Sequence, residues 1–194
     1  MSNPDAAYWL GWPTGGQYYK DCMWAYQKGC QFLQKYSRVK TSKQKCVVFD
    51  IDDTLVFGDP DEVIGVREME LGEHGGQQIF VLPRNEPICK LAEYAKKTGY
   101  FIIVLTARPK SSRAASITNM NMLHIPYHAL IMNDKDYDPC FKLKTRRDIA
   151  GKYDIAMTIG DQATDVLCPG GNCAAIKLPD PTLKASYAWF PPGI

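Results

Sequence analysis

The sequence predicts a three-layer α/β/α fold with a central parallel sheet of about five strands. Two observations support this prediction. Short continuous apolar runs, typical of strands buried on both faces, recur along the chain and several end in polar residues. Segments with helical periodicity separate most of these runs, and this alternation favours parallel strands joined by right-handed crossovers. The length of 194 residues suits a single domain spanning 1–194.

The first 45 residues precede the sheet and are predicted to form an N-terminal arm followed by a helix. Residues 8–16 are rich in aromatics and glycine without a period, which indicates an irregular arm. Residues 17–36 place Tyr18, Cys22 and Tyr26 on one stripe of an amphipathic helix. A basic connector at 38–45 then leads into the first strand.

The first strand begins at Cys46 and ends where apolar residues give way to Asp50 and Asp52. Residues 56–82 hold several glycines and a proline among acidic residues, so we predict a short flap or small insertion there. The elements predicted after it are helices at 83–98, 110–123 and 142–152, strands at 101–106, 128–132, 155–159 and 173–178, and a C-terminal tail at 179–194.

The composition excludes several classes of protein. The net charge of +2 is too small to indicate a nucleic-acid or membrane partner by itself. No apolar stretch approaches the roughly 20 residues of a membrane helix, and residues 1–13 lack the pattern of a secretory signal, so a cytoplasmic location is expected. The seven cysteines show no zinc-binding spacing and are expected to be free thiols.

Reactive residues follow three of the predicted strands. Asp50 and Asp52 follow the first strand, and Asp161 and Asp165 follow the strand at 155–159. Thr106 ends the strand at 101–106, and Arg108 comes two residues later. Because the carboxyl ends of parallel strands meet at one edge of a sheet, these side chains are expected to lie together. Four carboxylates there favour a hard cation such as Mg²⁺ over zinc, which prefers His or Cys.

The remaining residues of this edge are suited to bind a phosphoryl group. The Thr106 hydroxyl offers a hydrogen bond, and Arg108 or a lysine of the 142–152 helix offers positive charge. Arg108 has two open interpretations, a substrate contact or a local salt bridge. Most of the basic run at 142–147 is expected to form an exposed helix face.

These motifs resemble the haloacid dehalogenase (HAD) superfamily of aspartyl-phosphate enzymes. The chain carries DxDxT at 50–54, an apolar strand ending in Thr106, a lysine, and GDxxxD at 160–165. The sequences around 49–55, 160–162 and 176–181 look like the acid phosphatase branch related to plant vegetative storage proteins. The resemblance implies a Rossmann-like HAD fold, here capless because 56–82 and the segment after 106 are too short for a cap domain.

The resemblance also implies a role for each motif residue. Asp50 would be the nucleophile, Asp52 the general acid and base, and Thr106 a ligand of the phosphoryl oxygens. The Mg²⁺ ligands would be Asp50, the backbone carbonyl of Asp52, and Asp161, with Asp165 either a water-bridged ligand or an orienting group. The motif lysine would be Lys142, by its place after an aromatic residue, with Lys144 as the alternative.

The resemblance predicts a Mg²⁺-dependent phosphomonoester hydrolase. Asp52 argues for a phosphatase, because ion-pumping ATPases of the superfamily have threonine there and dehalogenases lack the acid. The rival hypotheses are a catalytically silent storage or binding protein on this fold and a phosphatase acting on nucleic-acid ends. The expected partner is a phosphorylated substrate, and the open site leaves room for a homo-oligomer that completes it.

Overall fold

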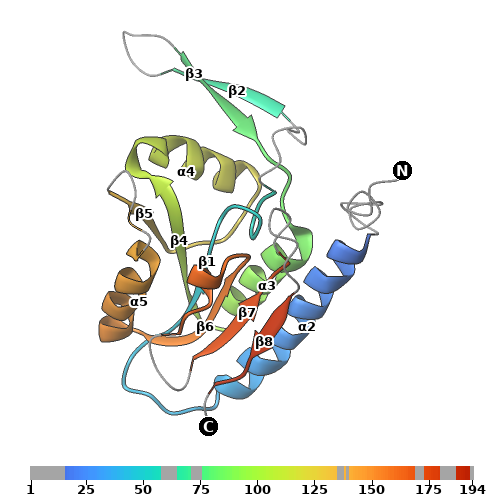
Figure 1. Ribbon diagram of the computed structural model, residues 1–194, viewed down its shortest axis with the longest axis vertical. Coiled ribbons are helices and arrows are strands. Elements are labelled where there is room, and N and C mark those ends of the chain that lie inside the picture. The colour runs from blue at the N-terminus through green and yellow to red at the C-terminus, as the bar shows by residue number, and fades with distance from the viewer. Residues whose placement is uncertain are drawn as a thin grey trace.

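The computed structural model has the predicted α/β architecture (Figure 1). It describes residues 16–57, 82–134, 138, 140–168, 173–179 and 187–192, and the backbone alone of residues 65–70 and 76–81. The arm before residue 16 and residues 180–186 of the tail lie outside the described residues. In the part of the chain that is described, no helix is both long and apolar enough to cross a membrane.

The central sheet has six strands in the order β5-β4-β1-β6-β7-β8. Their bounds are β1 Lys45–Phe49, β4 Phe101–Pro109, β5 Ala129–Asn133, β6 Asp154–Gly160, β7 Ala174–Lys177 and β8 Ala188–Phe190. The first five are mutually parallel, which confirms the predicted sheet. The sixth, β8, lies in the predicted tail and pairs antiparallel with β7.

Four α-helices of the described chain surround the sheet: α2 Gln17–Tyr36, α3 Glu86–Lys97, α4 Arg113–Met122 and α5 Phe141–Lys152. Two of them begin three residues later than predicted. The backbone at Pro83 and Arg84 is extended, since Phe57 N–H donates to the Pro83 carbonyl and Arg84 bridges to Val56. A 3₁₀ turn, Lys110–Ser112, precedes α4.

The two faces of the sheet carry two separate apolar clusters. Val47 and Phe49 of β1 point into the larger cluster with α2 and α3, whereas Cys46 and Val48 point into the smaller cluster with α5. This alternation follows from the two-residue period of a strand. Helices α2 and α3 therefore cover one face and α5 the other, which makes three layers (Figure 1).

The predicted flap contains a β-hairpin. Strands β2 (Gly65–Glu70) and β3 (Gly76–Val81) pair antiparallel as a separate two-stranded sheet. These strands were not predicted from the sequence, because the glycines around them indicated a loop. Bridges from Val56 to Asp52 and to Arg84 join the two ends of this insertion to the main body beside the end of β1.

Candidate functional site

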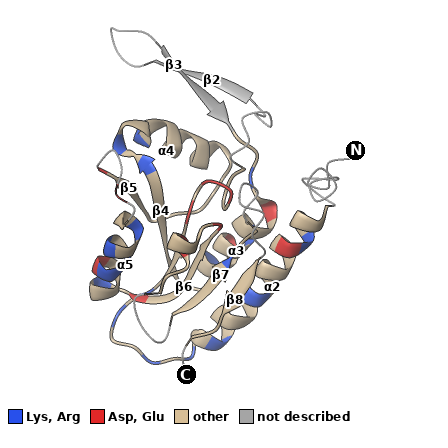
Figure 2. Cartoon of the chain, in the orientation of Figure 1, with Lys and Arg blue, Asp and Glu red and all other residues tan. Residues whose placement is uncertain are grey.

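The residues predicted to carry chemistry do meet at the carboxyl edge of the sheet. Asp50 directly follows β1, Asp161 directly follows β6, and Thr106 lies within β4. Strands β4 and β6 are the two neighbours of β1 in the sheet. The Asp50 N–H donates to the carbonyl of Ile159 at 3.0 Å, so the backbone of the β1 end is tied to β6. In Figure 2 the acidic colour of the loop after β1 lies among the strand ends, and basic residues line α5.

Three buried carboxylates form the centre of this site. Asp50, Asp161 and Asp165 each offer an oxygen, and the three oxygens lie within 4.8 Å of one another. Burial, followed by the charge of Asp165, raises the pKa of Asp50 well above its ordinary value, although Lys142 opposes this. Clustered oxygen donors with an unfavourable charge fit a divalent cation, which both neutralises and coordinates them.

Lys142, and not Lys144, is the lysine beside these carboxylates. The Lys142 ammonium lies 2.9 Å from Asp50 Oδ1 and 2.5 Å from Asp165 Oδ1, and its side chain is buried. Burial lowers the pKa of Lys142, but Asp50 and Asp165 outweigh it and the pKa is raised. Lys144 is exposed and pairs instead with Asp138 at 3.0 Å.

Asp165 is fixed by partners on both carboxylate oxygens. Its Oδ1 contacts Lys142, and its Oδ2 accepts from the Gln162 N–H at 3.1 Å within the short 3₁₀ turn Ala163–Asp165. The glycine before this turn makes the arrangement possible. A Cβ placed on Gly160 would lie 2.5 Å from Asp165 Cγ and would overlap the Asp165 Cβ.

Gly160→Ala is therefore expected to damage both the site and the fold. The added methyl group must displace Asp165 or β6, and overpacking of this kind costs about 1–3 kcal/mol in the free energy of unfolding. Chemical denaturation measures this loss. The matched control is Gly151→Ala in α5, where an added Cβ meets nothing within 4 Å and helix propensity predicts a gain of up to about 1 kcal/mol. Equal stabilities for the two variants would contradict the close packing of Gly160 on Asp165.

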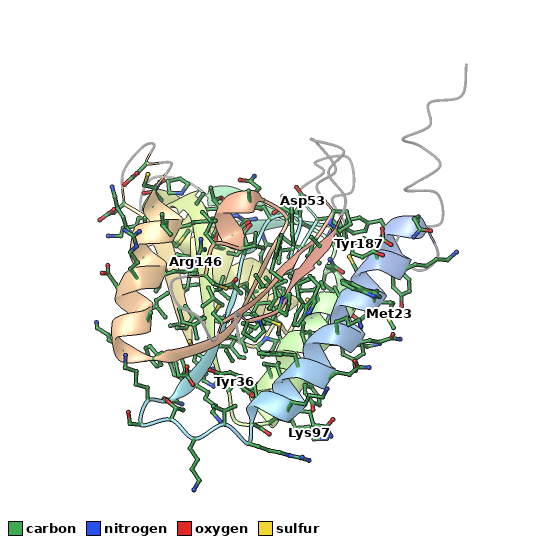
Figure 3. All side chains as sticks on the ribbon, turned by 60° about the horizontal axis from the view of Figure 1, so that its bottom comes forward. Met23, Tyr36, Asp53, Lys97, Arg146 and Tyr187 are labelled. Carbon is green, nitrogen blue, oxygen red and sulfur yellow. The ribbon has the colours of Figure 1, made fainter. Side chains whose placement is uncertain are left out.

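Arg146 holds the same segment from α5. Its side chain is only 1% exposed, its Nε donates to the Leu167 carbonyl at 3.0 Å, and its Nη2 donates to the Thr164 carbonyl. Most of the basic run was expected to be exposed, and Lys144 and Arg147 are. Arg146 is not, because α5 turns it inward together with Lys142, the lysine expected at the site. Figure 3 shows Arg146 between α5 and the sheet.

Asp52 and Arg108 form an ion pair at the more open side of the site. Arg108 Nε donates to Asp52 Oδ2 at 2.9 Å, and Nη2 contacts Oδ1 at 2.5 Å. A further Arg108 nitrogen, Nη1, donates to Ser116 in α4 at 3.0 Å. Thr106 is buried next to this pair, and its hydroxyl accepts from the Arg108 N–H at 3.2 Å. Of the two interpretations of Arg108, the structure therefore shows the local salt bridge, in the protein without substrate.

Two supporting residues were not predicted from the sequence. The Tyr18 hydroxyl in α2 donates to the carbonyl of Asp53 at 3.2 Å, and Asp53 has a left-handed backbone with φ of 51° (Figure 3 marks Asp53). Lys177 at the end of β7 donates to the carbonyl of Asp161 at 2.8 Å. Both contacts fix the loops that carry the carboxylates. The aromatic stripe of α2 had suggested only a hydrophobic cover.

The model of one protein family, described as HAD superfamily, subfamily IIIB (acid phosphatase), matches residues 74–186, which is more than half of the chain. No curated protein matches the sequence.

The solved structures with a similar fold include two of the class C acid phosphatase from Bacillus anthracis. One matches with a TM-score of 0.63 at 19% identity, over 86% of this chain and 70% of the other. The second, with tungstate bound, matches with a TM-score of 0.62 at 18% identity over the same shares. A chain of the Pnkp1/Rnl/Hen1 complex matches with a TM-score of 0.52 at 24% identity, over 73% of this chain and 48% of the other.

Proposed function

Because the chain belongs to subfamily IIIB of the HAD superfamily, the acid phosphatases, it is a phosphatase, and we propose that it hydrolyses phosphomonoesters with Mg²⁺ through an aspartyl-phosphate intermediate. One observation carries this proposal most directly. The buried carboxylate of Asp50 lies at the end of β1, with Lys142 at 2.9 Å and two further carboxylates beside it. In this proposal, these side chains provide the nucleophile, a fixed positive charge and the oxygen ligands of the metal.

In this proposal Asp50 attacks phosphorus and Lys142 offsets part of the negative charge. Mg²⁺ held by Asp50, Asp161 and the carbonyl of Asp52 would shield the nucleophile from the phosphate dianion. Asp165 acts as an orienting group, since both of its oxygens already have protein partners. Thr106 has its hydroxyl hydrogen available for a phosphoryl oxygen, because that hydroxyl accepts its bond from Arg108.

We infer that Asp52 exchanges protons with the leaving group and then with water. Its side chain is 42% exposed, whereas Asp50 is buried, so Asp52 faces the side from which an ester arrives. In the proposed cycle it protonates the departing alcohol oxygen and afterwards accepts a proton from the attacking water. Arg108 would release part of its contact with Asp52 to bind a phosphoryl oxygen.

Metal-dependent hydrolysis of p-nitrophenyl phosphate tests the proposal. We expect turnover between pH 5 and 8 with Mg²⁺ on the order of millimolar, loss of turnover after removal of the metal with EDTA, and recovery when Mg²⁺ is restored, because the uncompensated carboxylates repel the phosphate. Folded protein without turnover under any of these conditions would support the storage or binding alternative. Full turnover in EDTA would contradict the role of the metal.

A groove beside β5 favours nucleic-acid ends as a second candidate substrate. This groove has a volume of about 500 Å³, and its lining includes Lys110 and Asp134, which follow β4 and β5 at the edge of the sheet that carries the site. Arg113 and Lys152 add positive charge along it, and Asp148 partly offsets them. A phosphorylated oligonucleotide should then have a higher kcat/KM than a nucleoside monophosphate, and Lys152→Gln should reduce that preference. Equal values for both substrates would exclude the groove as a nucleic-acid track.

A further inference from the structure

A pair of thiols ends the segment that carries Asp165. Cys168 is half-buried and Cys173 is buried, and both are free. Both sulfurs donate to the same acceptor, the carbonyl of Ala174, at 3.5 Å and 3.3 Å. Because each sulfur lies within hydrogen-bond distance of the same oxygen, a small movement can bring the two sulfurs into bonding contact.

We propose that Cys168 and Cys173 are a redox modification site, which a low-molecular-weight disulfide such as oxidised glutathione converts to an intramolecular disulfide that lowers phosphatase activity. Cys168 reacts first, because it is the more accessible of the two. The neighbouring Cys173 lowers the pKa of Cys168 against the effect of burial, and Thr158 and Arg146 lower it further. Burial raises the pKa of the Cys22, Cys46 and Cys89 thiols to about 12 and keeps all three from an external disulfide. The pKa of Cys173 is raised too, by Cys168 and by burial, so Cys173 acts second, on the mixed disulfide beside it.

The reaction proceeds by two exchanges. The Cys168 thiolate attacks one sulfur of the oxidised glutathione, forms a mixed disulfide and releases one glutathione thiolate, which takes up the proton lost by Cys168. Cys173 then loses its proton and attacks the Cys168 sulfur, which releases the second glutathione as a thiol. The two protein thiols are oxidised and the external disulfide is reduced to two thiols, so electrons and protons balance.

The disulfide affects the site through the backbone before Cys168. A disulfide requires a sulfur separation of about 2.05 Å, which is shorter than a hydrogen-bonded contact. Cys173 directly precedes β7, which is paired with β6, so Cys168 is the residue that moves. Its neighbour Leu167 accepts the Arg146 bond that holds the Asp165 segment. Movement there displaces Asp165 relative to Lys142, and a displacement of about 1 Å in a catalytic site costs on the order of 100-fold in rate.

The test oxidises the full chain with oxidised glutathione and measures intact mass, peptide map and phosphatase activity. We expect a Cys168–Cys173 bridge, a decrease of kcat by at least about tenfold, and full recovery with dithiothreitol. Cys173→Ser should stop at the mixed disulfide on Cys168, and Cys168→Ser should form no bridge and keep its activity after oxidation. Cys140→Ser is the control for the exposed thiol, and it should respond to oxidation as the wild-type protein does.

Three outcomes would overturn the proposal. One is a peptide map without the bridge when the protein is fully oxidised. Another is a bridge that leaves kcat unchanged, and the third is loss of activity that persists in Cys168→Ser or disappears in Cys140→Ser. The mass and the peptide map do not depend on turnover, so failure of the thiol pair to react is distinguishable from failure of the proposed phosphatase mechanism.

Discussion

Asp50→Asn is expected to abolish phosphatase turnover and to leave the fold intact. An amide is a poor nucleophile and a poor metal ligand, and no other described carboxylate follows β1 at the same depth beside Lys142. Steady-state assays with p-nitrophenyl phosphate, together with circular dichroism of the variant, measure both parts of this prediction. Retention of more than about a few per cent of the activity would contradict the role of Asp50 as the nucleophile.

The same variant should change stability in a defined direction. Burial and the neighbouring Asp165 raise the pKa of Asp50, so the ionised carboxylate destabilises the metal-free fold. Stability from a carboxyl group with a raised pKa is present at low pH and is lost as the pH rises through that pKa. At neutral pH without metal, Asp50→Asn should therefore have an equal or higher Tm than the unmodified protein.

The response of the Tm to Mg²⁺ distinguishes the loss of a metal ligand in Asp50→Asn from a general change in stability. Mg²⁺ should raise the Tm of the unmodified protein, because a ligand that binds only the folded state stabilises it, and the rise should be smaller in Asp50→Asn. Asp134→Asn is the matched control. Asp134 follows β5 at the same edge of the sheet but is exposed and pairs with Lys110, so its loss should change neither turnover nor the response to Mg²⁺.

The carboxyl-edge position of the site could be predicted because it depends only on local patterns. Asp50, Thr106 and Asp161 each lie at or after an apolar run, and the parallel order of the strands brings those runs to one edge. Strand β8 could not be predicted in this way. It has only three residues and exists as a strand through its pairing with β7, which is a tertiary contact.

The supporting residues were missed for a related reason. Arg146 belongs to a basic helix whose polar sequence does not distinguish its buried face from its exposed face, whereas Lys142 in the same helix was predicted from its motif position. The contacts of Tyr18 with Asp53 and of Lys177 with Asp161 span 35 and 16 residues, so neither follows from local spacing. Only the packing of α2, α5 and β7 against the strand ends reveals which polar side chains hold the catalytic loops.

Asp52→Asn is expected to slow turnover by roughly 10²- to 10⁴-fold, the usual contribution of a positioned general acid. The reason is chemical, because an alkoxide leaves phosphorus poorly unless it is protonated as the bond breaks. Aryl phosphates with good leaving groups need less protonation. The loss should therefore be smaller for p-nitrophenyl phosphate than for an alkyl phosphate, and kcat/KM for the two substrates measures the difference.

The ion pair between Asp52 and Arg108 requires a separate control, because Asp52→Asn also removes the carboxylate that Arg108 binds through two nitrogens. Arg108→Gln breaks the same pair but keeps the acid. In this variant we expect kcat/KM to fall by the same factor for aryl and alkyl phosphates. The Arg108 charge would stabilise the phosphoryl oxygens, and this stabilisation does not depend on the leaving group. If Asp52→Asn also reduced both substrates equally, Asp52 would serve only to position Arg108, and the proton donor would have to be water or another group.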